Sequence, residues 1–146
     1  MTSLNGIRIL LAEDELIVAM QVAKDLADAG CVVLGPFKSV DRALGAIGDE
    51  PVDIGLLDVN LGGKWVYPCA EALAHKRVPF VFTTGYERAT LPAKYVDRPV
   101  MRKPYARDEL VSVVSETMGH HRRHGLCRAL GITDGTPLSL SQGSAR

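Results

Sequence analysis

Short apolar runs alternate with longer amphipathic segments along most of the chain. The apolar runs, mostly aliphatic or β-branched, are residues 7–11, 31–35, 52–57, 78–83 and 99–102. Apolar residues at helical spacing predict helices from Leu16 to Gly30, from Ser39 or Asp41 to Gly48, from Trp65 to His75 and from Ala106 to Met118. Strands that alternate with helices through short loops form a parallel sheet covered on both faces. With right-handed crossovers, the pattern predicts an α/β fold with a doubly wound five-stranded parallel sheet.

The segment between Thr84 and Lys103 departs from this alternation. Only residues 91–95 have helical character, and Pro92 together with the run at residues 97–99 limits the length of any helix there. We therefore expect the fourth helix of the fold to be one turn long or absent.

The composition changes after Gly119. A basic run at residues 120–124 precedes a small apolar patch and a Gly/Ser-rich end. We predict one domain over residues 1–120, followed by a C-terminal tail, residues 121–146, that is partly helical. A solvated helix end is the simplest interpretation of the basic run, and a docking contact or a homodimer contact is the alternative.

Charge and hydropathy exclude several classes of protein. The 146 residues include 17 Lys and Arg and 17 Asp and Glu, so no global field recruits nucleic acid or an anionic membrane. No run is apolar for long enough to span a membrane, and the N-terminus lacks the pattern of a signal peptide. Three widely spaced cysteines, Cys31, Cys69 and Cys127, are interpreted as small buried thiols of a reducing compartment. We therefore expect a cytoplasmic protein that binds neither nucleic acid nor membrane.

Polar side chains follow the ends of several predicted strands. Glu13 and Asp14 follow the first strand, Asp58 the third, Thr84 the fourth and Lys103 the fifth. In a doubly wound sheet, ligands bind outside the carboxyl ends of the strands. The sequence therefore predicts that three carboxylates, a hydroxyl and an amine converge on one small cleft.

These residue types suit phosphoryl transfer to a carboxylate. Carboxylates and a carbonyl oxygen are ligands that Mg²⁺ prefers, and without such a cation Glu13, Asp14 and Asp58 repel one another. Asp58 is then the candidate nucleophile toward phosphorus. Mg²⁺, Lys103 and the Thr84 hydroxyl are candidates to neutralise the equatorial oxygens of the transferred group.

The same residues resemble the receiver domain of two-component response regulators over residues 5–120. The matching motifs are LAEDE at 11–15, LLDVN at 56–60, TG at 84–85 and RKPY at 102–105. The resemblance implies the flavodoxin-like receiver fold. It also implies that Asp58 accepts a phosphoryl group from a sensor histidine kinase in a Mg²⁺-dependent reaction.

The resemblance assigns a role to each matching residue. It implies that Glu13, Asp14, Asp58 and Asn60 hold Mg²⁺, Asn60 through its backbone carbonyl, and that Asp58, Thr84 and Lys103 act on the phosphoryl group. It implies a cis peptide bond between Lys103 and Pro104. A receiver assists only its own phosphorylation and dephosphorylation, so the resemblance implies a switch and not an enzyme with a separate substrate.

One motif narrows the resemblance. Residues 79–86, PFVFTTGY, are similar to the PFxFATGY motif of the FATGUY subgroup of receivers, with Thr83 in place of its alanine. Members of this subgroup often stand alone or pair with kinases of the HWE class or a related class. Val100 occupies the position that usually carries an aromatic switch residue. We hypothesise that the signal leaves through the loop from Thr84 to Tyr86.

Other functions fit part of the sequence. With no DNA-binding or enzymatic output domain in the chain, we expect an effect through contact with an unknown protein target, or a role as a phosphate sink or phosphorelay intermediate. An aspartyl-phosphate phosphohydrolase usually needs an acid two residues after its nucleophile, where this chain has Asn60. A pseudo-receiver is the remaining alternative, but the complete set of acidic and phosphoryl-binding residues argues against it.

Overall fold

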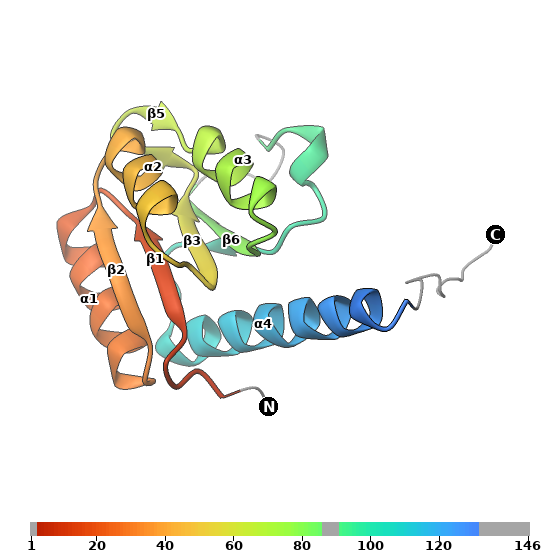
Figure 1. Cartoon of the computed structure of the whole chain (residues 1–146). Helices are drawn as coiled ribbons and strands as arrows, with labels where there is room; N and C mark the ends of the chain where they lie inside the picture. The colour runs from red at the N-terminus through yellow and green to blue at the C-terminus, as the bar shows by residue number, and fades with distance from the viewer. Residues whose placement is uncertain (1–2, 86–90, 132–146) are drawn as a thin grey trace.

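Five strands form one parallel sheet in the computed structural model, which describes residues 3–85 and 91–131 (Figure 1). The strands are β1 (Arg8–Ala12), β2 (Val32–Phe37), β3 (Ile54–Asp58), β6 (Phe80–Thr84) and β7 (Val100–Arg102). They lie in the order β2-β1-β3-β6-β7, and every neighbouring pair is parallel. The sequence-based prediction of a doubly wound five-stranded sheet is confirmed. This order places β1 and β3 side by side at the centre, where the chain reverses its direction of winding.

Helices cover both faces of the sheet. They are α1 (Leu16–Asp28), α2 (Val40–Asp49), α3 (Tyr67–His75) and α4 (Arg107–Ala129). α2 and α3 pack on one face over Leu10, Leu57 and Phe82, whereas α1 and α4 pack on the other over Leu11 and Leu56 (Figure 1). Successive residues of β1 and β3 therefore point into opposite cores, which explains why these strands are apolar at nearly every position.

Local signals set the helix ends near the predicted positions. The Ser39 hydroxyl accepts a hydrogen bond from the Arg42 amide at 3.2 Å and caps the first turn of α2. Helix α1 is followed by Gly30 at a φ of +98°, a conformation that residues with a Cβ rarely adopt. These two positions fix where the chain turns back toward the sheet.

The connection between β6 and β7 has no α-helix among its described residues. A 3₁₀ turn, η2 (Ala93–Tyr95), lies where the other crossovers have a helix, which confirms the expected short or absent fourth helix. Tyr95 is buried, and its ring contacts those of Phe80 and Phe82 at centroid distances of 5.9 and 5.4 Å. A buried aromatic ring thus fills space on the sheet that a longer helix would cover.

Three elements differ from the sequence-based predictions. Helix α4 continues to Ala129, well beyond the predicted end at Met118, and it projects past the sheet (Figure 1). Strand β2 continues through Pro36, because an edge strand tolerates a residue without an amide donor. The predicted loop after Asp58 contains a small antiparallel pair, β4 (Asn60–Leu61) and β5 (Lys64–Trp65).

Two of the three thiols are enclosed in the cores. Cys31 and Cys69 are buried and free, as expected, and burial raises the pKa of Cys69 to about 11. The side chain of Cys127 lies outside the described residues. Among the helices that the structure describes, none is both long enough and apolar enough to cross a membrane.

Candidate functional site

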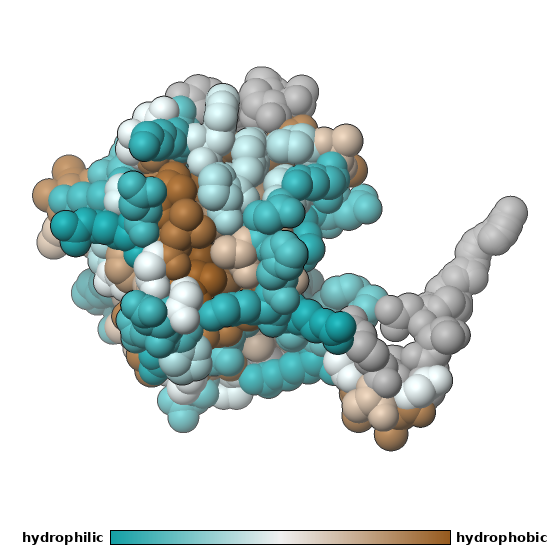
Figure 2. Space-filling model, turned by 45° about the horizontal axis from the view of Figure 1, so that its top comes forward, coloured by the Kyte–Doolittle hydropathy of each residue, from teal (hydrophilic) through white to brown (hydrophobic). Residues whose placement is uncertain are grey.

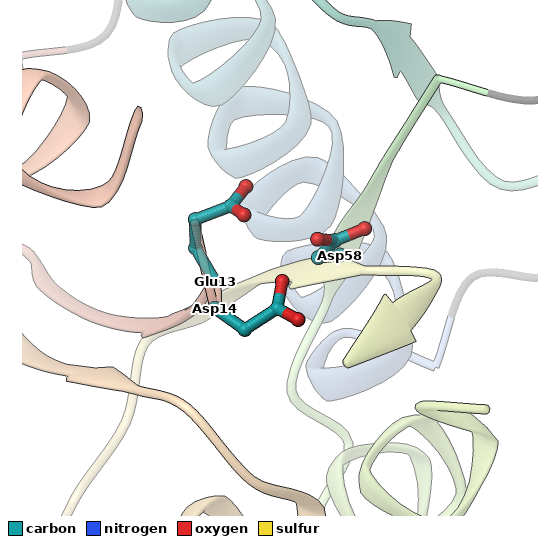
Figure 3. A group of neighbouring side chains, drawn as sticks. All are labelled: Glu13, Asp14 and Asp58. Atoms are coloured by element: carbon teal, nitrogen blue, oxygen red, sulfur yellow. The ribbon is translucent and has the colours of Figure 1, made fainter. Parts of the chain in front are cut away.

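Three carboxylates gather at the carboxyl ends of the two central strands. Glu13 and Asp14 directly follow β1, and Asp58 is the last residue of β3. Their carboxylate oxygens lie within 4.8 Å of one another, and Figure 3 shows the three side chains pointing toward a common space. Glu13 and Asp58 are buried, with exposed fractions of 2% and 5%. Burial of like charges at this spacing is unfavourable unless a cation compensates them or one carboxylate takes up a proton.

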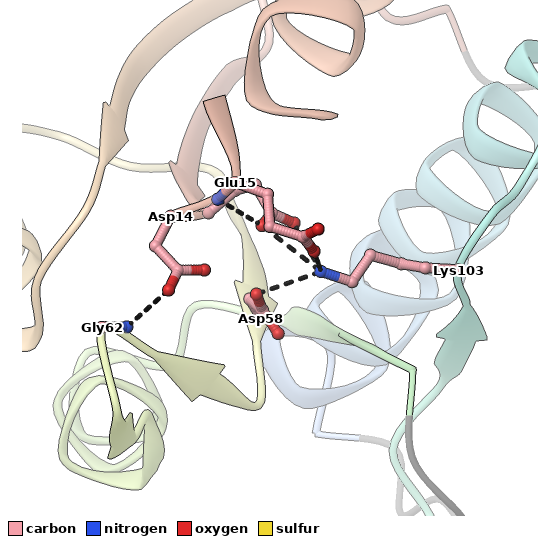
Figure 4. Close-up of polar contacts among 6 residues, drawn as sticks. Asp14, Glu15, Asp58, Gly62 and Lys103 are labelled. Atoms are coloured by element: carbon pink, nitrogen blue, oxygen red, sulfur yellow. Dashed lines mark hydrogen bonds and ion pairs between the residues drawn. The ribbon is translucent and has the colours of Figure 1, made fainter. Parts of the chain in front are cut away.

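Lys103 supplies positive charge at this point. Its Nζ lies 3.1 Å from an oxygen of Glu13, 3.1 Å from Asp58 Oδ2 and 2.7 Å from Glu15 Oε1 (Figure 4). Lys103 follows β7, two strands away from β3, and its backbone amide donates to the carbonyl of Thr84. The strand order therefore brings together residues that are 45 positions apart in the sequence.

The loop after β3 closes the other side of the site. The Gly62 amide donates a hydrogen bond of 2.9 Å to Asp14 Oδ2, which orients this carboxylate (Figure 4). Gly62 has a φ of +60°, and a Cβ built there would lie 2.9 Å from the carbonyl oxygen of Lys38. The position therefore requires glycine for both conformation and space.

Electrostatics in this cluster favour a bound cation. Burial, and then the charge of Glu13, raise the pKa of Asp58 to about 7, although Lys103 acts in the opposite direction. Burial disfavours the charge of Lys103, but its hydrogen bond to Glu15 and the charges of Asp58 and Glu13 outweigh this and raise its pKa. One ammonium group is thus shared among more carboxylates than it can neutralise.

Of the remaining predicted site residues, Asn60 lines the same space, and Thr84 ends the strand next to β3. A cleft of about 310 Å³ is lined by Asp14, Glu15, Asp58, Asn60, Gly85 and Lys103. Thr84 ends β6 and is 2% exposed, and Thr83 is equally buried next to it. The structure therefore brings all the predicted positions to one edge of the sheet. The Lys103–Pro104 bond is cis, as expected.

The donor set fits a hard divalent cation. Carboxylate oxygens of Asp14 and Asp58 face each other across the cleft, and Asn60 lies on its wall. Mg²⁺ prefers oxygen ligands and is usually held by one or two carboxylates. The acidic cluster of Glu13, Asp14 and Asp58 therefore offers the donors that such an ion needs.

Two contributors were not predicted from the sequence. Glu15 belongs to the matching motif at 11–15 but was given no role in the site; its carboxylate pairs with Lys103, and it makes no capping hydrogen bond. Gly62 was not among the predicted site residues. A continuous acidic run was the signal for Glu15, since neighbouring acids at a strand end often share one cation. No signal in the sequence identified the contact between Gly62 and Asp14.

Two aromatic residues that follow the loop after Asp58 stack on each other but differ in their surroundings. Trp65 is 52% exposed and stacks on Tyr67 at 5.9 Å, while Tyr67 stacks on Tyr95 at 5.7 Å. Tyr67 therefore belongs to the packing around η2.

Val100, at the position that usually carries an aromatic switch residue, is half-buried and pairs with Phe82 in the sheet. Tyr86, on which the hypothesis of signal output rests, lies outside the described residues.

Comparisons with known proteins identify the family. The chain is 35% identical to SdrG from Sphingomonas melonis Fr1, covering 81% of this chain and 98% of that one, with a TM-score of 0.67. A BeF3-activated conformation of SdrG, attributed to Pseudomonas melonis Fr1, is 34% identical over 81% of this chain and 99% of that one, with a TM-score of 0.67. No family model matches the chain. With this fold and acidic site, the protein is of the phosphoacceptor switch type. The chain belongs to the receiver domains of two-component response regulators.

A curated relative extends the comparison. The transcriptional regulatory protein PdtaR of Mycobacterium tuberculosis is 24% identical over 119 residues, which cover 79% of this chain. The chain spans 58% of the length of PdtaR.

Proposed function

We propose that Asp58 accepts a phosphoryl group from a partner histidine kinase in a Mg²⁺-dependent reaction, and that the phosphorylated protein signals by contact with another protein. The observation that carries this proposal is the ion pair between the buried Asp58 carboxylate and Lys103, at 3.1 Å, beside the acidic cluster. An Asp58 oxygen attacks phosphorus as the bond to the kinase imidazole breaks, and the leaving nitrogen keeps the electron pair.

The side chains around Asp58 have distinct tasks in this proposal. Asp14, Asp58, Glu13 and the backbone carbonyl of Asn60 would hold Mg²⁺, which supplies charge that neutralises phosphoryl oxygens. Lys103 leaves its ion pair with Asp58 and binds a phosphoryl oxygen. The Thr84 hydroxyl donates to a further oxygen, because Thr84 ends the strand next to β3.

A docking surface for the kinase lies next to this cleft. Leu16, Ile17 and Met20, on the first turns of α1, are exposed by 57%, 84% and 62%. They directly follow the acidic residues that form the site. Exposed apolar side chains that gather beside a site are suited to contact with a partner protein. The similarity of residues 79–86 to the FATGUY motif supports a kinase of the HWE class or a related class.

Two observations weigh against the other candidate functions. Asn60 occupies the position at which an aspartyl-phosphate hydrolase carries its general acid, so repeated turnover is not expected. Glu13, Asp14, Asp58 and Lys103 form one connected cluster, which a pseudo-receiver does not require. A role as phosphate sink or relay intermediate uses the same chemistry at Asp58 and differs only in what becomes of the phosphoryl group afterwards.

Incubation with acetyl phosphate, with and without Mg²⁺, tests the proposal. Intact-mass spectrometry should detect one phosphoryl group on the wild-type protein in Mg²⁺ and none in Asp58→Asn. Asp49→Asn is the matched control, because it removes an exposed carboxylate at the end of α2, before the amino end of β3, whereas Asp58 lies at the carboxyl end of that strand. Equal labelling of Asp58→Asn, or continuous hydrolysis of the donor without a stable adduct, would contradict the proposal.

A further inference from the structure

A second cavity lies at the other end of the sheet. It has a volume of about 670 Å³ and is bordered by Val78 to Phe80 and by Pro99, at the amino ends of β6 and β7, and by one side of α4. Asp58, Thr84 and Lys103 lie at the opposite, carboxyl ends of the strands. Figure 1 shows α4 passing close to the amino end of β6 before it projects from the domain. A cavity of this volume matches a small organic ligand.

Basic side chains dominate its polar lining. Arg77 and Arg98 come from the sheet side, and His120, His121 and His124 come from α4. Asp97 is the one carboxylate that lines the cavity within the described part of the chain. The Arg98 guanidinium lies 4.3 Å from the centroid of the Phe80 ring, a stacked position that holds it in place. The protein has no net charge, so this is a local concentration of positive and hydrogen-bond-donating groups.

Arg77 occupies a strained backbone position. Its φ is +59°, and it is the one residue other than glycine with a positive φ in the described ranges. The Arg77 amide donates to the Ala74 carbonyl and the Val78 amide donates to the Leu73 carbonyl, which together form a Schellman ending for α3. Glycine is strongly preferred at this position of the motif. An arginine there carries a backbone cost and places a guanidinium on the wall of the cavity.

We propose that this cavity binds a small multivalent anion that bears phosphate groups. Guanidinium groups form paired hydrogen bonds to phosphate oxygens, and imidazoles donate further hydrogen bonds across the cavity. Arg77 and Arg98 outnumber the single carboxylate of Asp97, so the charged lining is positive, and the three histidines add ring N–H donors for an anion with several oxygens. The site shares no residue with the acidic cluster, so it stands independently of phosphorylation at Asp58.

Calorimetric titration with pyrophosphate, in buffer containing a chelator of divalent cations, tests the proposal. Wild-type protein should bind one pyrophosphate, and Arg77→Gly should weaken the binding about ten-fold, the loss expected for one charged hydrogen-bonding group. Arg122→Gln is the control, since Arg122 is exposed on α4, the helix that supplies the three histidines, and does not line the cavity. Asp58→Asn should bind pyrophosphate as wild type does.

A second readout separates binding from folding. Because glycine relieves the backbone cost at residue 77, Arg77→Gly should unfold at a higher temperature than wild type although it binds pyrophosphate more weakly. The proposal would be overturned by absence of saturable binding to wild type, or by equal weakening in Arg77→Gly and Arg122→Gln. Tighter binding of a tetra-aspartate peptide than of pyrophosphate would overturn the assignment to phosphate.

Discussion

The two ends of the sheet hold their charged side chains in different ways. At the carboxyl ends, Glu13 and Asp58 are almost fully buried, and each contacts Lys103 at about hydrogen-bond distance. At the amino ends, the basic groups line an open cavity, and much of that lining comes from the projecting half of α4. The first site is built from strand termini, which the fold positions with little freedom. The second depends on a helix that extends beyond the sheet.

This contrast gives the two ends different physical characters. At the acidic end the carboxylates repel one another, and a bound cation or phosphoryl group can change this repulsion. At the basic end the backbone cost lies at one residue, Arg77. The basic side chains there are half-buried or exposed. Figure 2 shows a further apolar surface at the far end of α4, where Leu126 and Leu130 are exposed by 60% and 63%.

Among these substitutions, removal of the Lys103 ammonium should have the largest effect, because it slows the phosphorylation of Asp58 itself. Such an effect would show that one cation organises the acidic end. Lys103→Met should slow phosphorylation by acetyl phosphate about 100-fold, because the variant loses the charge that stabilises the transferred group. Rates can be measured by intact-mass spectrometry at saturating Mg²⁺. Lys24→Met, which removes an exposed lysine paired with Asp28, should react at the wild-type rate. Equal rates for Lys103→Met and wild type would show that Lys103 takes no part in phosphoryl transfer.

Substitution of two adjacent glycines, Gly62 and Gly63, tests how tightly the loop that closes the acidic end is packed. Gly62→Ala should lower the free energy of unfolding by about 2 kcal/mol, since the new Cβ meets the carbonyl of Lys38 in a strained conformation. Gly63→Ala should cost only about 1 kcal/mol, because Gly63 has a similar φ of +82° but no atom within 4 Å of the new Cβ. Urea denaturation measures both.

The same pair of variants tests the link between the loop and the metal site. Gly62→Ala should also weaken Mg²⁺ binding, because displacement of the Gly62 amide releases the Asp14 carboxylate. Gly63→Ala should bind Mg²⁺ as wild type does. If both variants bind Mg²⁺ equally well, the hydrogen bond from Gly62 does not organise the site.

The smallest predicted effect concerns how the free energy of unfolding changes with pH. Folding raises the pKa of Asp58 from 3.8 to about 7, so in the metal-free protein the folded state holds a proton that the unfolded state loses. The stabilisation from Asp58 is therefore present below pH 3.8 and is lost as the pH rises toward 7. Asp58→Asn should gain about 1 kcal/mol over wild type between pH 5 and 8, since Lys103 stabilises part of the charge that Asp58 acquires. Denaturation without Mg²⁺ measures this difference, and a constant difference across the range would contradict it.

The sequence predicted the acidic end well and the basic end poorly, for physical reasons. Strand ends are visible as the points where apolar runs stop, and parallel strands bring these ends to one edge. Helix α4 was predicted too short because its buried positions, Leu110, Val114 and Met118, end where the sheet ends. The helical turns beyond them have no apolar periodicity, so the basic run resembled a tail.

Other features depend on three-dimensional detail that residue spacing does not encode. The ion pair between Glu15 and Lys103 depends on where a flexible lysine side chain points, although the two residues are 88 positions apart. The left-handed conformation of Arg77 contradicts the usual preference for glycine at a helix end, and propensity therefore argued against it. Such exceptions become visible only when the backbone is known.

Location of the phosphoryl group tests the central claim most directly. Borohydride reduces an aspartyl phosphate to homoserine with release of phosphate, so reduction of acetyl-phosphate-treated protein followed by tandem mass spectrometry identifies the modified residue. The account predicts homoserine at residue 58 and at no other aspartate, and only when Mg²⁺ is present. Homoserine at Asp14 or Asp53, or unmodified Asp58 in a protein that has taken up phosphate, would contradict it.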